Sequence, residues 1–469
     1  MDEKLADRPA TQVAESLPEP ETGEAHSING QAQNGRPQGA NGSAAAHTEG
    51  MGMGRGGGGG ISLRSLKTFN SFQVPAFRLY FAAMVGQGSA MNMQMMAQSL
   101  LVYRVTGSAT ALGLMSLANA IPMLVFSLFG GVLADRVKKK YVFIAGQFAS
   151  AVIAVGIAVA LTSGYLSEGN PGSFWVLVVA SMFQGMVMGL IAPARQAFIA
   201  EVVGEERLMN AISLSMLEMN TLRLIAPAVA GFLIEGFGFQ SIYYVMTGMY
   251  VLCGALIVPL KVTSTMKIGG RGAVQQMVDG LRYVRKETTL LLVLGITFFS
   301  ILLSMPYMTL LPMFTEDVLK VGAGGLGVLL SVSGIGAMAC ALVLASLPNK
   351  RRGAMLMVGC IILGLALLGF SISHWWYLSL AMIIFIGLGQ TARMSLANTL
   401  LNYYVDAAYR GRVMSLMMME FGLTSFGAFV TAIVAGAVGV QWAVGSLAAI
   451  LIVMATAGLV LVPRIRRLD

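Results

Sequence analysis

The sequence predicts an all-α membrane protein with twelve transmembrane helices in two pseudo-symmetric six-helix bundles. Hydrophobic residues make up 56% of the 469 residues and charged residues only 11%, whereas soluble domains carry about 25% charge. Apolar stretches long enough to cross a bilayer follow one another from Phe77 to Val462. Short basic clusters separate them, so the net charge of +9 indicates membrane topology and not a nucleic-acid surface.

Twelve stretches of about 20 apolar residues are the predicted spans, because a helix satisfies its own backbone groups where lipid offers no partners. In the first half they cover residues 80–102, 111–133, 141–163, 174–200, 211–235 and 241–260. In the second half they cover residues 290–312, 324–347, 354–372, 376–400, 413–436 and 442–462. The predicted domains are a disordered cytoplasmic tail (1–70), a bundle (71–260), a cytoplasmic linker (261–289) and a second bundle with a short basic tail (290–469).

The basic residues predict the orientation of the chain. Lys and Arg in short loops tend to stay in the cytoplasm, and here they occupy every second loop, around Lys139, Arg207, Lys350 and Arg410. Only Arg104 and Lys320 fall in the alternate loops. We therefore expect a multi-pass protein of the cell (inner or plasma) membrane with both termini in the cytoplasm.

An internal repeat supports the division into two halves. Residues 212–218 (Ile-Ser-Leu-Ser-Met-Leu-Glu) correspond to residues 414–420 (Met-Ser-Leu-Met-Met-Met-Glu), and each copy opens the fifth helix of its half. Duplicated bundles are common in transporters. Chance similarity between two apolar stretches is the alternative, but both copies place a carboxylate, which is rare inside a membrane, at the same position.

The loop after the second predicted helix resembles the signature loop of the major facilitator superfamily. In that family a Gly is followed after three residues by Asp and Arg, and then by a Gly and two basic residues. Here the matching residues are Gly131, Asp135, Arg136, Lys139 and Lys140, with Lys138 in place of the second Gly. The resemblance covers about residues 75–463 and implies a facilitator fold with alternating access, a cytoplasmic gate at this loop, and a monomer.

The gate is expected to involve the start of the eleventh predicted helix. Asp135 would face the positive N-terminal end of that helix, or Arg412 just before it, in the outward-open state. Arg410 and Arg412 are therefore included among the gate residues. The alternative is a solvated turn that serves only as a topology marker.

The fifth helix resembles the Gly-Pro-x-x-Gly-Gly motif of the superfamily's antiporters. The matching residues are Ala226, Pro227, Ala230 and Gly231, with Ala at two Gly positions. In the fourth helix Ser181 stands where the family has an Arg, so proton coupling cannot be assigned to that Arg. Segments 193–195, 210–211 and 410–413 resemble the branch that contains the enterobactin exporter and macrolide efflux proteins.

Few charged residues fall inside the predicted spans. Because each costs at least ~2.5 kcal/mol there, each needs a partner, a water-filled cavity or a function. We expect Arg195 to pair with Glu218, and Arg393 with Glu420. These pairs are either structural, or the carboxylates carry protons and release their Arg when protonated. Arg223 is turned about 140° from Glu218 on the helix. We therefore expect it to interact with a neighbouring helix or with a substrate anion.

Polar and aromatic side chains mark a candidate substrate cavity. Gln87, Gln94 and Gln98 share one face of the first helix, with Asn92 nearby. We expect these side chains either to line a water-filled cavity or to make hydrogen bonds between helices. The aromatic candidates lie in the seventh helix and are Phe298, Phe299 and Tyr307.

These observations favour a secondary active exporter of an amphipathic small molecule, such as a drug, macrolide or siderophore, in exchange for protons. Uptake or facilitated diffusion of a small nutrient, with structural roles for Glu218 and Glu420, is the alternative. A membrane enzyme or scaffold finds little support, since the sequence has no Gly-x-x-x-x-Gly-Lys phosphate loop and its three His lie outside the predicted spans. No cofactor or metal is expected; the expected partners are the bilayer, the substrate and protons.

Overall fold

The computed structural model describes residues 71–204, 207–260, 280–347, 350–406, 409, 412–413, 416, 419–466 and 468. All of them belong to one compact unit, Ile61–Asp469. They form helices and connecting turns, and no strand occurs within these ranges. The predicted tail and residues 261–279 of the predicted linker lie outside them, whereas residues 280–284 are helical.

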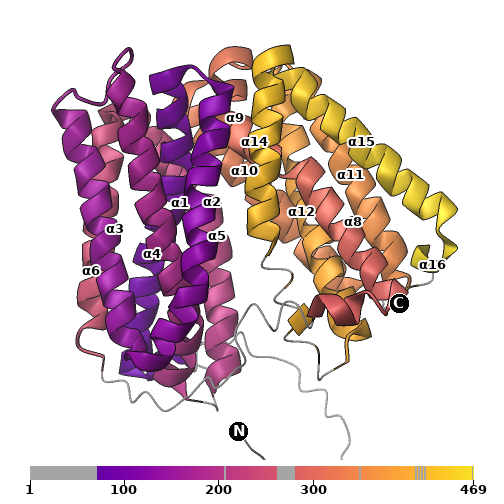
Figure 1. Ribbon diagram of the computed structural model, residues 1–469, viewed down its shortest axis with the longest axis horizontal. Helices are drawn as coiled ribbons and strands as arrows, with labels where there is room; N and C mark the ends of the chain where they lie inside the picture. Colours follow the sequence, from indigo (N-terminus) through magenta and orange to yellow (C-terminus); the bar gives the residue numbers. More distant parts are fainter. Residues whose placement is uncertain are drawn as a thin grey trace, which may run out of the picture. The chain divides into compact units, whose positions relative to one another are not determined.

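Each predicted span of the first half corresponds to one helix (Figure 1), although the third and sixth spans run one and three residues past the helix end. The helices are α1 (Pro75–Thr106), α2 (Ala109–Arg136), α3 (Lys139–Thr162), α4 (Pro171–Val203), α5 (Leu208–Phe237) and α6 (Phe239–Ile257). Several extend beyond the apolar stretch because their end turns carry polar residues, as at Arg104 and Arg136.

The second half contains α8 (Thr288–Ser304), α9 (Pro306–Met313), α10 (Gly322–Ser346), α11 (Arg352–Ile372), α12 (Trp376–Tyr404), α14 (Met419–Val438), α15 (Val440–Leu461) and α16 (Pro463–Arg466). The predicted seventh span is interrupted between Ser304 and Pro306, because proline has no N–H to continue the helix ladder. A π-helix, η3 (Phe314–Val318), follows α9.

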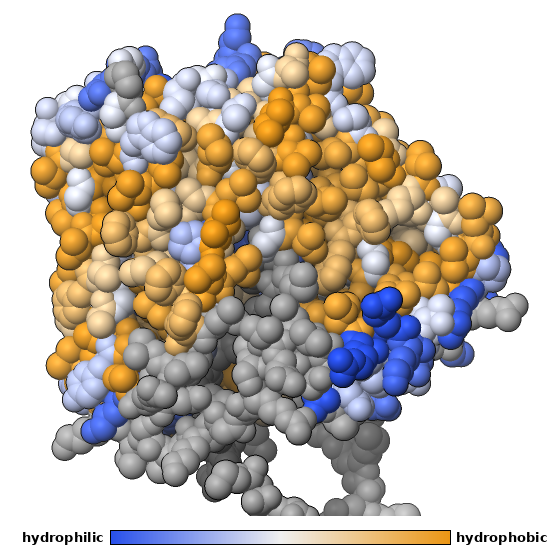
Figure 2. Space-filling view, in the orientation of Figure 1, coloured by the Kyte–Doolittle hydropathy of each residue, from blue (hydrophilic) through white to orange (hydrophobic). Residues whose placement is uncertain are grey.

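The surface of the helices matches a bilayer. Among the described residues, ten helices are long and apolar enough to cross a membrane, and Gly422–Val438 in α14 is a shorter apolar helix. Large apolar side chains point outward, such as Leu342 and Val152 at 72% and 68% exposure. Figure 2 shows apolar residues over most of the visible face, with hydrophilic residues gathered toward two of its edges. The predicted all-α membrane fold is confirmed.

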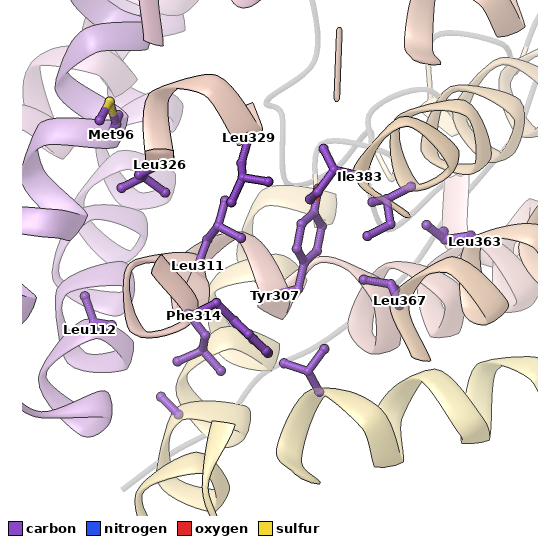
Figure 3. Close-up of a cluster of buried hydrophobic side chains, with 14 of the residues drawn as sticks. Met96, Leu112, Tyr307, Leu311, Phe314, Leu326, Leu329, Leu363, Leu367 and Ile383 are labelled. Atoms are coloured by element: carbon purple, nitrogen blue, oxygen red, sulfur yellow. The ribbon is translucent and has the colours of Figure 1, made fainter. Parts of the chain in front are cut away.

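The most extensive contacts between the halves are those of α5 with α10 and of α2 with α14, and α1 and α2 also contact α9. One hydrophobic cluster contains residues of both halves, with Met96 and Leu112 on one side and Leu363 and Leu367 on the other (Figure 3). A second cluster, around Phe143, belongs only to the first six helices. We call the end where α1 meets α2 the distal end, and the end near residues 280–284 the linker end.

Candidate functional site

The second half contains a buried ion pair between α12 and α14. Arg393 Nη1 lies 3.3 Å from Glu420 Oε1, and the two side chains are 1% and 21% exposed. Gln390, one turn earlier on α12, accepts hydrogen bonds from Arg393 Nε at 3.3 Å and Nη2 at 3.2 Å. Gln390 in turn donates to Ser304 Oγ of α8 at 3.4 Å. The guanidinium is thus held on two sides, and the predicted pair of Arg393 with Glu420 is present.

The corresponding pair of the first half is not formed, so the predicted contact of Arg195 with Glu218 was wrong. Glu218 is 5% exposed, and neither carboxylate oxygen has a hydrogen-bond partner in the described part of the chain. Arg195 acts on Glu218 only electrostatically, without an ion pair. The residue three positions before Arg195 is Ala192, which cannot hold the guanidinium as Gln390 holds Arg393.

Space for the Glu218 carboxylate is provided by a glycine of α1. A Cβ atom at Gly88 would lie 2.7 Å from Glu218 Oε1 and 2.8 Å from Leu222 Cδ1. Two further buried oxygens nearby in the sequence, Gln87 Oε1 and Ser215 Oγ, also lack a partner among the described residues. Buried polar groups of this kind are usually satisfied by water. The first half therefore presents a buried carboxylate in a tight space between α1 and α5.

Arg223 of α5 stands apart from both clusters. Its side chain is exposed, and within the described ranges it has no hydrogen bond or ion pair. It is close enough to act electrostatically on Tyr307 of α9, in the other half. Tyr307 itself is 5% exposed and lies in the large cluster between Leu311 and Ile383 in Figure 3.

The polar stripe of α1 is used in different ways along its length. Gln94 accepts a hydrogen bond from Tyr250 of α6 at 2.7 Å, which is a contact between helices. Asn92 donates to the Gly88 carbonyl of its own helix at 2.8 Å. Gln87 is buried and Gln98 half-buried. The structure thus gives Gln94 the alternative role of a helix-to-helix bond, and a cavity role for the other three stays a prediction.

The aromatic candidates of α8 do not share one environment. Phe298 packs against the large cluster, while Phe299 is 60% exposed. Phe298 and Phe299 are consecutive, so their side chains point about 100° apart on the helix. The two rings therefore do not face the same space. Their role in substrate binding stays a prediction.

The gate motif is only partly described. The backbone of Gly131, Asp135 and Arg136 forms the last turns of α2, but their side chains and all of Arg410 lie outside the described residues. The contact predicted for Asp135 thus stays a prediction. Arg412 lies over the Tyr409 ring, 5.0 Å from its centroid.

The two lysines of the motif make contacts within the first half. Lys139 Nζ is 2.6 Å from Glu201 Oε1 of α4, and this pair is 1% and 6% exposed. Lys140 donates to the carbonyls of Val258 and Leu260, at 2.6 and 2.7 Å, after the end of α6. Both residues therefore tie the linker ends of helices together in this conformation.

The antiporter-like motif packs directly against the second half. Ala226, Pro227, Ala230 and Gly231 are all buried. A Cβ atom at Gly231 would lie 2.5 Å from the Ala323 carbonyl oxygen, and one at Gly327 would lie 2.4 Å from the Pro227 carbonyl oxygen. The backbones of α5 and α10 therefore touch, with small residues on both sides.

Polar contacts across the halves occur at the distal end, and sequence analysis missed them. Arg104 Nη2 lies 2.8 Å from Glu316 Oε1 of η3, and the Tyr103 hydroxyl donates to Asp317. Arg104 was visible in the sequence as an exception to the basic-loop pattern. Glu316 and Asp317, the adjacent acidic residues that follow the seventh predicted span, were the sequence signal for its partner.

The described helices define a multi-pass, all-helical membrane protein with two joined halves. Residues 79–426 match the family model of the Major Facilitator Superfamily. The chain belongs to this superfamily, so it is a membrane transporter whose partners are the bilayer and a small-molecule substrate.

Relatives place the chain in the branch indicated by its motifs. The staphyloferrin A transporter of Staphylococcus aureus is 25% identical over 337 residues, 71% of this chain and 83% of that protein. Macrolide efflux protein A of Streptococcus pyogenes is 22% identical, over 80% of this chain and 93% of that protein. The enterobactin exporter EntS of Shigella boydii is 23% identical, over 76% of this chain and 83% of that protein.

Solved structures agree on the fold. The nucleoside transporter NupG superimposes with a TM-score of 0.68 at 12% identity, covering 81% of this chain and 98% of NupG. At this identity the similarity shows the fold alone.

Proposed function

We propose that this transporter exports amphipathic small molecules in exchange for protons, and that Glu218 is the carboxylate that carries the proton. The observation behind this proposal is the burial of Glu218 without a hydrogen-bond partner among the described residues. A carboxylate without a hydrogen bond or ion pair is costly in the membrane interior, and binding a proton removes its charge. Glu218 is therefore expected to change its protonation state when water reaches it.

Glu420 is less suited to the same task. Its carboxylate lies 3.3 Å from the nearly fully buried Arg393. Protonation of Glu420 would leave that guanidinium as a buried charge without a counterion, which is strongly unfavourable. We therefore assign Glu420 a structural role.

The basic loops support an orientation with both termini and the linker end in the cytoplasm. The distal end is then the extracellular end, and its bridges hold the outside closed in this conformation. The Asp135 loop would close the inside in the opposite state, acting between the halves 71–260 and 290–469 of a monomer. The siderophore and macrolide named for the relatives support an amphipathic cargo.

The test is proton flux in inside-out vesicles after addition of lipophilic cations, macrolides or siderophores. Substrate-dependent proton release is expected from the wild type and from Glu168→Gln, whose exposed carboxylate lies in the α3–α4 loop. Glu218→Gln should abolish it, because the amide cannot carry a proton.

Two outcomes would contradict the proposal. Proton release that persists in Glu218→Gln but vanishes in well-folded Glu420→Gln would exchange the two roles. Substrate movement down its gradient without proton release would favour facilitated diffusion.

A further inference from the structure

One face of α5 is covered at the distal end and uncovered toward the linker end. Pro227 and Gly231 are buried on this face against α10. Arg223 lies four residues before Pro227, so it points in the same direction one turn nearer the linker end. Met216 and Met219, seven and four residues before Arg223, continue the face and are 59% and 54% exposed.

The opposing face of α10 shows where the two helices separate. Gly327 lies against Pro227, and Ser331 Oγ accepts a hydrogen bond from the Ala228 backbone at 3.1 Å. Gly334 still approaches Leu224. Met338, one further turn along this face, is 44% exposed. The uncovered part of α5 therefore begins directly below Leu224, and it includes Arg223.

Arg223 carries a charge that the described residues leave uncompensated. A cation at membrane depth needs water or a counterion, since burial in lipid costs at least ~2.5 kcal/mol. Arg223 shares a face of α5 with Pro227, which packs against α10 of the second half. It also lies close enough to Tyr307 of α9 to act on it electrostatically. The charge therefore lies on the side of α5 that faces the second half. A structural ion pair, the other role considered for Arg223, is not formed within the described ranges.

We propose that Arg223 binds the carboxylate of an amphipathic organic anion between the two halves, while Met216, Met219 and Met338 contact its apolar part. This assignment rests on the proposed transport function and names the chemical class of the cargo. The guanidinium offers two parallel N–H donors that match a carboxylate. Methionine thioethers adapt to apolar groups of different shapes.

The test uses the purified full-length protein and two pairs of probes, 1-pyrenebutyrate and 2-naphthylacetate, each with its methyl ester. The concentration dependence of the melting temperature gives a Kd for each probe, because a ligand that binds only the folded state stabilises it. Wild type should bind each acid at least ~10-fold more tightly than its ester, since hydrogen bonds between charged groups contribute more than neutral ones.

Substitution of the arginine separates the charge from the surrounding surface. Arg223→Gln should weaken acid binding by about 10- to 100-fold and leave ester binding unchanged. Arg223→Lys should retain part of the preference, because it keeps the charge but loses the paired donors. Arg285→Gln, which removes an exposed charge beside residues 280–284, should behave as wild type. The melting temperature without probe reports whether each variant is folded.

Equal binding of acid and ester by the wild type, or no binding of either, would overturn the proposal. It would also be overturned if folded Arg223→Gln kept the preference for the acid. A failure of the exporter proposal alone gives a different result. In that case the acid preference depends on Arg223 as expected, but substrate addition releases no protons in vesicles.

Discussion

The two halves carry the same Arg and Glu residues and use them differently. In the second half Arg393 and Glu420 form a buried pair, whereas in the first half Glu218 has no hydrogen-bond partner among the described residues. The difference depends on a third residue, because Gln390 positions Arg393 and Ala192 cannot do the same for Arg195. A repeated charge pattern therefore marks equivalent positions without fixing which of them form an ion pair.

The largest expected effect comes from breaking the pair of the second half. Glu420→Gln should destabilise the protein by about 3 kcal/mol, because it leaves Arg393 buried without a counterion. Glu218→Gln should cost little or be stabilising, since the described residues offer Glu218 no hydrogen-bond partner that could be lost. Melting of the two purified variants, followed by tryptophan fluorescence, compares the two sites directly.

A double substitution checks the cause of that effect. Arg393→Leu combined with Glu420→Leu should recover much of the loss, because no unpaired charge remains. Equal destabilisation by Glu218→Gln and Glu420→Gln would show that the two carboxylates have equivalent environments, contrary to the structure.

A smaller effect is expected from filling the space beside Glu218. Gly88→Ala places a methyl group 2.7 Å from the carboxylate, and overpacking of this kind costs about 1–3 kcal/mol. The transport rate should fall as well, since the displaced carboxylate is the proposed proton carrier.

Gly156→Ala is the matched control, because nothing lies within 4 Å of a Cβ atom there. It should leave stability and transport unchanged or slightly improved. If Gly88→Ala also had no effect, the tight contact between α1 and Glu218 would be refuted.

The smallest effect concerns the distal bridge between the halves. The side chains of Arg104 and Glu316 are 36% and 25% exposed, so Glu316→Gln should change stability by at most about 1 kcal/mol. The same energy shifts the equilibrium toward an open distal end by up to about fivefold. Maleimide labelling of Ala435→Cys, a position that is 3% exposed here, measures that opening.

The background in this experiment is low because Cys253, Cys340 and Cys360 are buried. The charge-reversed pair Arg104→Glu with Glu316→Arg should return labelling to the wild-type rate. Unchanged labelling in Glu316→Gln would mean that the bridge does not hold the halves together.

Most of the helical architecture follows from the sequence, because lipid requires long apolar surfaces and a satisfied backbone. The interruption at Pro306 could have been expected from proline, but the π-helix after it depends on packing. Of the site, the repeat located both carboxylates, and the scarcity of charged residues inside the predicted spans located both arginines. It could not show that Gly88 approaches Glu218, since no local pattern connects α1 with α5.

The distal bridges were beyond sequence reasoning for a similar reason. Tyr103 and Asp317 are 214 positions apart, and Arg104 and Glu316 are 212 apart. Helical periodicity relates residues within a few turns and gives no information at such separations. Only the fold brings these side chains together.

The backbone contact between α5 and α10 also has an electrical consequence. With Gly231 directly against Ala323 and Gly327 against Pro227, no space remains at those points for a water molecule. A chain of water molecules would conduct protons and dissipate the voltage across the bilayer. That voltage stores about 2.3 kcal/mol per charge for each 100 mV. Glycine at these two positions thus keeps water out of the contact between α5 and α10, which would block ion leakage along this seam.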